Sequence, residues 1–160
     1  MNILVIGGTR FFGIHMVNEL LTAGYDVTIA TRGKASDSFG DKVKRIFLER
    51  TKEESVREAL SGTHYDVVID KIAYCSNDIK YVMDVIDCDK YIYMSSTSVY
   101  NPKHINTVEA DFDGIENELI WCDRKAFHYE QIKRQAECAL WQQYPEKNWI
   151  AVRYPFAIGK

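Results

Sequence analysis

The chain has 160 residues, of which 46% are hydrophobic and 27% are charged, proportions that exclude a disordered or collagen-like chain. Its formal net charge of −3 argues against nucleic acid or an anionic membrane as the main partner. No apolar run reaches the roughly 18–20 residues of a membrane span. The four cysteines form no CxxC pair and no metal-ligand spacing, which predicts reduced thiols and no metal site. The start MNILVIGG lacks the features of a signal peptide, so we expect a cytoplasmic protein.

Short apolar runs alternate with helical patterns along the chain. Length, flanking residues and β-branched content predict strands at residues 2–6, 26–31, 43–48, 65–70, 90–94 and 149–153. Apolar residues at helical spacing predict helices at residues 12–23, 53–60, 77–86 and 124–143. This alternation is typical of a parallel sheet that is covered on both faces. We therefore expect one α/β domain over residues 1–160.

The first predicted strand runs directly into a glycine-rich turn that opens a helix. Gly7 permits a tight turn, and Gly8 removes a Cβ where a pyrophosphate would approach. Gly13 lets the helix pack close to the strand, and the first N–H groups of the helix attract an anion. Arg10 and Phe11 occupy the region where a dinucleotide fingerprint has its middle glycine. We expect this turn to bind a dinucleotide, with a purely structural turn as the alternative; its residues are Gly7, Gly8, Thr9, Arg10, Phe11, Phe12 and Gly13.

The residues after the second predicted strand indicate which dinucleotide is bound. An acidic residue there would bind the ribose 2′-hydroxyl of NAD. This chain instead has Arg32 and Lys34, and an arginine suits a 2′-phosphate through paired hydrogen bonds. Together with Arg10 they predict a site that favours NADP over NAD. The alternative is that Arg32 and Lys34 are ordinary solvated loop charges.

Three residues are candidates for proton transfer. Tyr129 and Lys133 lie four positions apart on the last predicted helix and share a face. A lysine ammonium near a phenol lowers the pKa of the phenol and prepares it for proton transfer. Ser96 follows the fifth predicted strand, at the edge of the sheet where ligands bind, and could polarise a carbonyl. The alternatives are a surface Tyr–Lys pair and a serine-rich turn that bonds its own backbone.

These features together resemble the short-chain dehydrogenase/reductase superfamily, in its extended or atypical NAD(P)-dependent epimerase/dehydratase branch. The glycine turn is similar to the GGTRFxG turn of an atypical subgroup, whose members carry isoflavone reductase-like, sugar dehydratase-like or mRNA-binding labels. Residues 95–100 resemble the SSxxVYG segment, in which Ser96 takes the catalytic position. Tyr129 and Lys133 resemble the YxxxK motif of the superfamily.

Three further positions resemble the family less closely. Residues 153–155 resemble an RPG-type segment, although Phe156 stands where the family commonly has glycine. Glu49 lies where the family often has an aspartate that contacts adenine. Ala73 lies where it has a small residue near the cofactor.

The resemblance implies a doubly wound Rossmann sheet in the strand order 3-2-1-4-5-6. It implies hydride transfer between a nicotinamide cofactor and a small-molecule or nucleotide-sugar-like substrate. In that reaction Tyr129 is the general acid/base, Lys133 lowers its pKa and holds the nicotinamide ribose, and Ser96 orients the substrate oxygen. It also implies a possible homodimer formed through the helix that carries the YxxxK motif.

Members of this branch are about twice as long, and most of their substrate-binding part follows the sixth strand. The resemblance therefore implies that the substrate subdomain is missing here. We expect the chain to be an N-terminal fragment of a longer protein; the alternative is a natural truncation that binds the cofactor without turning over substrate. Two other functions remain open beside an enzyme core: a non-catalytic dinucleotide-binding regulator and an RNA-binding protein. The presence of Ser96, Tyr129 and Lys133 favours the enzyme over the regulator. The acidic balance and the absence of a basic stripe argue against RNA.

Overall fold

Strands and helices alternate along the described residues, 1–100 and 102–155, of the computed structural model. The strands are β1 (Asn2–Ile6), β2 (Asp26–Thr31), β3 (Lys44–Phe47), β4 (His64–Asp70), β5 (Asp87–Met94) and β6 (Trp149–Val152). The α-helices are α1 (Phe12–Thr22), α2 (Glu53–Leu60), α3 (Ser76–Met83) and α4 (Tyr129–Gln143). Short 3-10 turns are η1 (Gly40–Lys42), η2 (Thr97–Val99) and η3 (Glu109–Asp111).

All six strands form one parallel sheet in the order β3-β2-β1-β4-β5-β6. Strand β1 is central and buried, because it pairs with β2 on one side and with β4 on the other. Strands β2 and β3 are added on one side of β1, and β4, β5 and β6 are added on its other side. This confirms the predicted doubly wound Rossmann order, and it places the switch point at the carboxyl ends of β1 and β4.

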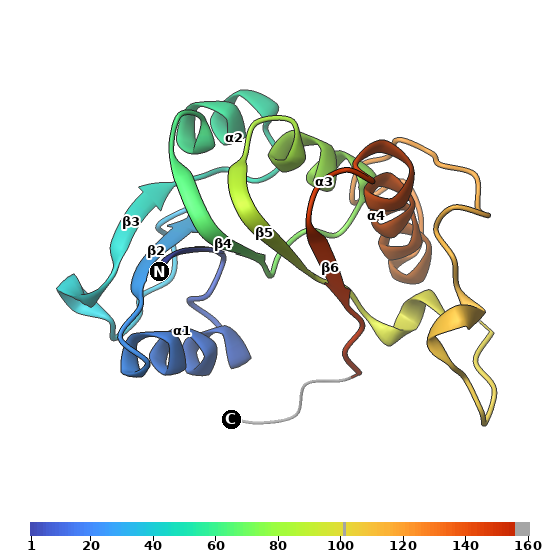
Figure 1. Ribbon diagram of the computed structural model, residues 1–160, viewed down its shortest axis with the longest axis horizontal. Helices are drawn as coiled ribbons and strands as arrows, with labels where there is room; N and C mark the ends of the chain where they lie inside the picture. Colours follow the sequence, from blue (N-terminus) through green and yellow to red (C-terminus); the bar gives the residue numbers. More distant parts are fainter. Residues whose placement is uncertain (101, 156–160) are drawn as a thin grey trace.

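Helices cover the two faces of the sheet unequally (Figure 1). Helix α1 lies alone on one face, where Val17 packs on Val5 and Ile29. Helices α2, α3 and α4 share the other face, and their apolar residues join the larger of the two main core clusters. Among the described residues, no helix is both long and apolar enough to cross a membrane.

The face of the sheet that carries α1 is uncovered at β6. Ile150 is 44% exposed and Val152 is 39% exposed, although both lie in a strand. No described helix lies over them, so the prediction of a sheet covered on both faces holds for β1 and β2 but not for β6.

Helix α4 is shorter than predicted. It begins at Tyr129 rather than at residue 124, because His128 has extended backbone angles and residues 124–127 form turns. The Arg124 side chain holds this segment in place. Its guanidinium donates to the Asp78 carboxylate at 2.9 Å and to the Ile72 carbonyl at 2.8 Å. These long-range contacts override the local helical pattern.

Candidate functional site

The turn between β1 and α1 requires glycine for two reasons. Gly7 and Gly8 have φ values of +101° and +102°, a region that other residues rarely adopt. A Cβ on Gly8 would also lie 3.1 Å from side-chain atoms of both Val5 and Val17. The backbone of Gly8 therefore packs directly on the core beneath the turn, where a side chain would not fit.

Gly13 brings the start of α1 against this turn. A Cβ at Gly13 would lie 2.9 Å from the Gly8 Cα and 2.9 Å from the Lys71 Cε. Phe11, the residue before α1, also has a positive φ of 51°, which is strained for an aromatic residue. Its side chain is 79% exposed. The turn is thus held in a conformation that leaves the N-terminus of α1 without a side-chain cap.

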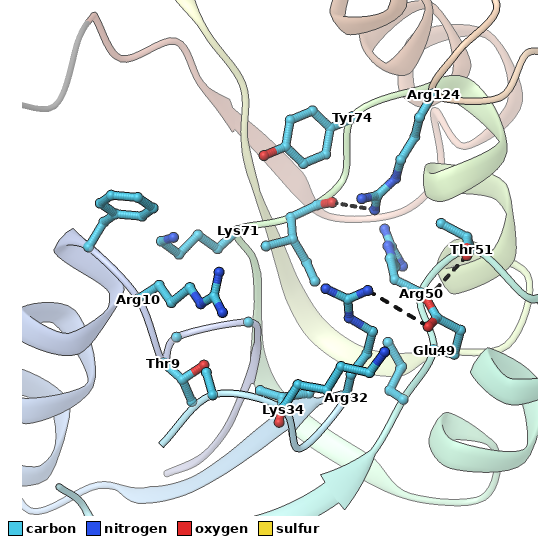
Figure 2. A pocket seen from close by; sticks show the side chains of 17 residues that line it. Thr9, Arg10, Arg32, Lys34, Glu49, Arg50, Thr51, Lys71, Tyr74 and Arg124 are labelled. Carbon is cyan, nitrogen blue, oxygen red and sulfur yellow. Dashed lines mark hydrogen bonds and ion pairs between the residues drawn. The ribbon is translucent and has the colours of Figure 1, made fainter. Parts of the chain in front are cut away.

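A cavity of about 430 Å³ lies beside the glycine turn, at the carboxyl ends of β1, β2, β3 and β4 (Figure 2). This is the edge at which doubly wound sheets bind ligands. Among its lining residues, those predicted from the sequence are Gly7, Gly8, Thr9, Arg10, Phe11, Arg32, Lys34 and Glu49. The sequence did not predict the remaining lining residues, of which the charged or aromatic ones are Arg50, Lys71, Tyr74 and Arg124.

The missed residues come from segments that meet only in the folded chain. Lys71 and Tyr74 follow β4, and Arg124 precedes α4 and lies 4.8 Å from the centre of the Tyr74 ring. Burial lowers the pKa of Lys71, whose ammonium lies 4.5 Å from the centre of the Phe12 ring. For Lys71 and Tyr74, the position after β4 is the feature of the sequence that could have predicted them, because residues there lie at the edge of the sheet where ligands bind.

The cavity is strongly cationic although the chain as a whole is acidic. Figure 2 shows basic side chains gathering from the glycine turn and from the ends of β2, β3 and β4. Among the described lining residues Glu49 is the acidic one, and its carboxylate lies 4.0 Å from the Arg32 guanidinium. A dianionic ligand would therefore meet an excess of positive charge.

Arg50 belongs to the buried part of the cavity wall and is paired there with Asp70. It is fully buried and donates to the Asp70 carboxylate, which also accepts a hydrogen bond from the Tyr91 hydroxyl at 2.8 Å. The other Asp70 oxygen accepts from the backbone N–H groups of Ile72 and Ala73 at 3.1 and 3.0 Å. This network fixes the backbone after β4, from which Lys71 and Tyr74 extend.

Lys133 is buried and does not extend into the cavity. Its ammonium donates to the carbonyls of Ala73 and Met94, both at 2.8 Å, and lies 4.6 Å from the centre of the Tyr93 ring. Burial lowers the pKa of Lys133 to about 7, against the opposing effect of Asp70. The lysine therefore ties α4 to the ends of β4 and β5.

Tyr129 stands at the start of α4 and is 41% exposed. Its ring lies 6.1 Å from that of Tyr74, in an edge-to-face arrangement, so the aromatic pair connects it to the cavity lining. Burial raises the pKa of Tyr129, and interaction with the Ser96 hydroxyl opposes this shift. The ammonium of Lys133 is engaged by two carbonyls and is not among the causes of this shift, and its expected effect on Tyr129 stays a prediction.

Ser96 follows β5 and begins η2. Its hydroxyl accepts from the Ser98 N–H at 3.1 Å and lies 3.1 Å from the Ser98 hydroxyl, so it also caps its own turn. The neighbouring Ser95 is buried and donates to Glu137 of α4. Ser96 and Tyr129 are thus brought together by α4, whereas Lys133 contacts the backbone beside them.

Some predicted cofactor residues lie beneath the cavity rather than in its lining. Ala73 is fully buried, and its carbonyl accepts the Lys133 hydrogen bond. The Phe12 ring lies 5.4 Å from that of Tyr154, at the other side of the glycine turn. Gly13 acts through its close contact with Gly8. Phe156, where the resemblance has glycine, lies outside the described residues.

Arg153 joins three elements beside the site. Its guanidinium contacts the buried Glu137 carboxylate through two nitrogens, the shorter contact being 2.6 Å. The same group donates to the Tyr100 hydroxyl at 2.8 Å and to the Phe112 carbonyl at 3.0 Å. Burial alone would lower the pKa of Arg153, but these hydrogen bonds raise it well above its ordinary value. The end of β6, α4 and the loop after β5 are therefore locked together.

One group of potential metal ligands occurs among the described residues, at the opposite edge of the sheet. Single ligand atoms of His64, Asp66 and Asp89 lie within 4.8 Å of one another. His64 is also 3.2 Å from Asp87, whose hydrogen bond raises the pKa of the imidazole. The group lies near the amino ends of β4 and β5, and the cavity lies at the carboxyl ends of the strands.

Comparisons with known proteins agree with this geometry. The family model described as NAD dependent epimerase/dehydratase family matches residues 3–159. The chain is 31% identical over 171 residues to the chloroplast stem-loop binding protein of 41 kDa b from Arabidopsis thaliana. That match covers 98% of this chain but 42% of the relative, so the chain spans less than half of the relative's length.

Solved structures show the same fold. An epimerase from Methanothermobacter thermautotrophicus superposes with a TM-score of 0.72 at 16% identity, covering 95% of this chain and 50% of that one. A short-chain dehydrogenase/reductase from Veillonella parvula, solved in complex with NADP, gives 0.65 at 14% identity, covering 95% and 68%. Vestitone reductase from alfalfa gives 0.60 at 18%, covering 95% and 56%. With residues 3–159 matched and the Rossmann order observed, the chain belongs to the NAD dependent epimerase/dehydratase family.

Proposed function

We propose that this chain binds NADP in preference to NAD and forms the cofactor-binding core of an NADP-dependent reductase, epimerase or dehydratase. The observation that carries the proposal is the cation-lined cavity beside the bare glycine turn. The family implies a nicotinamide dinucleotide, and the residues present fit one, since the cavity beside the glycine turn is lined by the basic side chains of Arg10, Arg32 and Lys34. A pyrophosphate would meet backbone N–H groups, the start of α1 and the nearby Lys71.

The preference for NADP rests on Arg32 and Lys34. Both follow β2 and line the cavity, and an arginine can bind a phosphate through two parallel hydrogen bonds. A 2′-hydroxyl offers these cations no charge to neutralise, so they distinguish the two cofactors by electrostatics.

The reaction would take place at the far end of the cavity, near Tyr129. The bound nicotinamide would supply or accept a hydride. Tyr129 would exchange a proton with the substrate oxygen, and Ser96 would hold that oxygen by a hydrogen bond. Lys133 would support the phenol by fixing the backbone of Ala73 and Met94, and by placing positive charge beneath Tyr74. The substrate is a small molecule, and a second copy of the chain could pack against α3 and α4.

Arg32→Ala tests the cofactor preference. We expect unaltered protein to bind NADPH about tenfold more tightly than NADH, because the 2′-phosphate gains a charge-assisted pair. The substitution should abolish that ratio while leaving NADH affinity within about twofold. Fluorescence titration of both nucleotides measures it, with Arg57→Ala, a surface arginine of α2 paired to Glu53, as the matched control. Equal affinities in the unaltered protein would contradict the preference.

Tyr129→Phe tests the catalytic assignment in a protein that carries the substrate-binding part. Loss of the phenol should reduce kcat by about 10²–10⁴-fold, the range of general acid–base catalysis, while NADPH affinity stays nearly constant. Tyr81→Phe removes a hydroxyl from α3 and serves as the control. Turnover that survives Tyr129→Phe would remove the residue from this role.

A second candidate function is recognition of structured RNA. It is favoured by the name of the Arabidopsis thaliana relative, a stem-loop binding protein that matches nearly the whole chain. Phosphates of RNA could also meet the cationic cavity. Fluorescence anisotropy with a labelled RNA stem-loop, repeated with excess NADPH, separates the two functions. Binding of NADPH without binding of RNA supports the cofactor function; tight RNA binding without any NADPH binding supports the second.

A further inference from the structure

Glu49 stands out in the cavity because it carries the opposite charge from its neighbours. It follows β3, and its Oε2 atom lies 4.0 Å from Nη1 of Arg32, which follows β2. The sheet imposes this proximity. Thr31 and Phe47 are paired in the β2–β3 register, and the Leu48 N–H donates to the Thr31 carbonyl at 2.9 Å. Arg32 is the first residue after β2 and Glu49 the second after β3, so the pairing of the two strands brings them close together at the edge where ligands bind.

The local structure holds Glu49 more firmly than Arg32. The Thr51 hydroxyl donates to Oε1 of Glu49 at 3.1 Å, and the backbone N–H of Glu49 donates to the Ser55 hydroxyl at 3.0 Å. The Glu49 side chain is 25% exposed, against 55% for Arg32. The carboxylate is thus a fixed group with one oxygen directed toward the guanidinium, and the guanidinium is the partner that can move.

The other charge pairs beside the cavity differ from this one. Arg50 is fully buried against Asp70, and Arg124 is paired with Asp78 at 2.9 Å. Both have acceptors that a ligand would not displace. The pair of Arg32 and Glu49 is long and half exposed, so its attraction is weak and an incoming phosphate can replace it.

We propose that Glu49 is a specificity-determining residue that limits the preference for NADPH by competing with the 2′-phosphate for Arg32. The idea rests on the proposed NADP-binding function. A phosphate that binds Arg32 must take the guanidinium away from Glu49, and the loss of that attraction disfavours NADPH. A ribose 2′-hydroxyl carries no charge, so NADH leaves the pair of Arg32 and Glu49 in place. Glu49 therefore opposes NADPH and tolerates NADH, whereas Arg32 favours NADPH.

The test measures dissociation constants of NADPH and NADH for the unaltered chain, Glu49→Gln, Arg32→Ala and the double variant. Glu49→Gln should raise the NADPH-over-NADH preference about five- to tenfold, mainly by tighter NADPH binding. In the Arg32→Ala background the same change should move the preference by less than about twofold, because the competition no longer exists. Glu53→Gln is the control, since Glu53 has the same charge change on α2 and pairs with Arg57.

A second measurement uses fragments that isolate the ribose phosphate. The ratio of affinities for 2′,5′-ADP and 5′-AMP should respond to Glu49→Gln as the whole cofactors do. An unchanged ratio, a change equal to that of Glu53→Gln, or a change that persists without Arg32 would overturn the proposal and leave NADP binding intact. Failure of the unaltered chain to bind either dinucleotide would instead overturn the proposed function, and this inference with it.

Discussion

Lys133 shows how burial redefines a residue whose role seems clear from its motif. Its position four residues after Tyr129 predicts an ammonium beside a phenol, yet the ammonium is held by the carbonyls of Ala73 and Met94. Moving this charge out of water lowers the pKa of Lys133 to about 7, and its two carbonyl partners accept hydrogen bonds whether or not it carries the third proton. The Lys133 side chain therefore has a structural role, and its effect on Tyr129 is exerted through the backbone and the Tyr74 ring that it contacts.

The lowered pKa of Lys133 predicts how the free energy of unfolding depends on pH. In the unfolded chain the lysine keeps its proton up to about pH 10.4, whereas the folded chain releases it near pH 7. Between these values the unfolded state binds more protons, so this residue makes the folded state more stable as the pH rises. The slope is up to about 1.4 kcal/mol per pH unit, so the gain from pH 7.5 to 8.5 is about 1 kcal/mol.

Urea unfolding at these two pH values measures the effect, and Lys133→Met should remove it. Lys147→Met is the matched control, because Lys147 also donates to two backbone carbonyls, those of Met83 and Ile86, but is exposed. The assignment is contradicted if Lys133→Met retains the pH response of the unaltered chain.

Helix α4 is the element that assembles the reaction end of the site. It carries Tyr129 at its first residue, Lys133 one turn later and Glu137 one turn after that. Glu137 accepts hydrogen bonds from Ser95 after β5 and from Arg153 after β6. One face of the helix therefore holds together the ends of two strands, and the spacing of four residues along a helix is what allows it.

Breaking the contact between Glu137 and Arg153 should loosen this element. Glu137→Gln leaves a mostly buried guanidinium without its counter-charge, which should lower the free energy of unfolding by about 3–5 kcal/mol. The double substitution Glu137→Leu with Arg153→Met should recover much of that loss, because it removes both charges. Urea denaturation compares these variants with Glu130→Gln, a control on the same helix. A loss below about 1 kcal/mol for Glu137→Gln would mean that the pair does not hold the element.

The whole molecule combines an acidic surface with a cationic cavity. Its net charge is −3, yet basic side chains dominate around the glycine turn. Composition averages over the chain, whereas a ligand at the cavity responds to charges within about one Debye length. The sheet brings these charges together, because the ends of β1, β2, β3 and β4 meet at one edge.

This charge distribution predicts a salt dependence that differs between the cofactors. Raising NaCl from about 0.05 to 0.5 M should weaken NADPH binding by roughly tenfold, because screening reduces its attraction to the exposed cations. NADH should lose less, since it lacks the 2′-phosphate. Isothermal titration calorimetry at four NaCl concentrations gives the slope of affinity against salt concentration for each nucleotide. Sulfate is left out of the buffer because it would compete as an anion. Parallel slopes for the two nucleotides would show that the 2′-phosphate is not held by charge.

The alternation of elements and the glycine turn could be predicted from the sequence, because each depends on neighbours within a few positions, whereas the strand order followed only from the resemblance. Gly7 and Gly8 are such a case, since a positive φ is a local demand. Arg32 could also be placed at the ligand edge, because it directly follows β2. Once a strand is predicted, the residues that follow it can be placed at the ligand-binding edge of a parallel sheet.

Only the tertiary structure decided which charges face one another. Glu49 meets Arg32 across 17 positions of sequence because β2 and β3 are paired in one register, and Arg124 reaches Ile72 across 52 positions. It also decided that Lys133 turns to backbone carbonyls and that one face of β6 is left open. These features arise from distances between segments that are remote along the chain. No pattern of neighbouring residues encodes such distances, so packing of the whole sheet and its helices is what sets them.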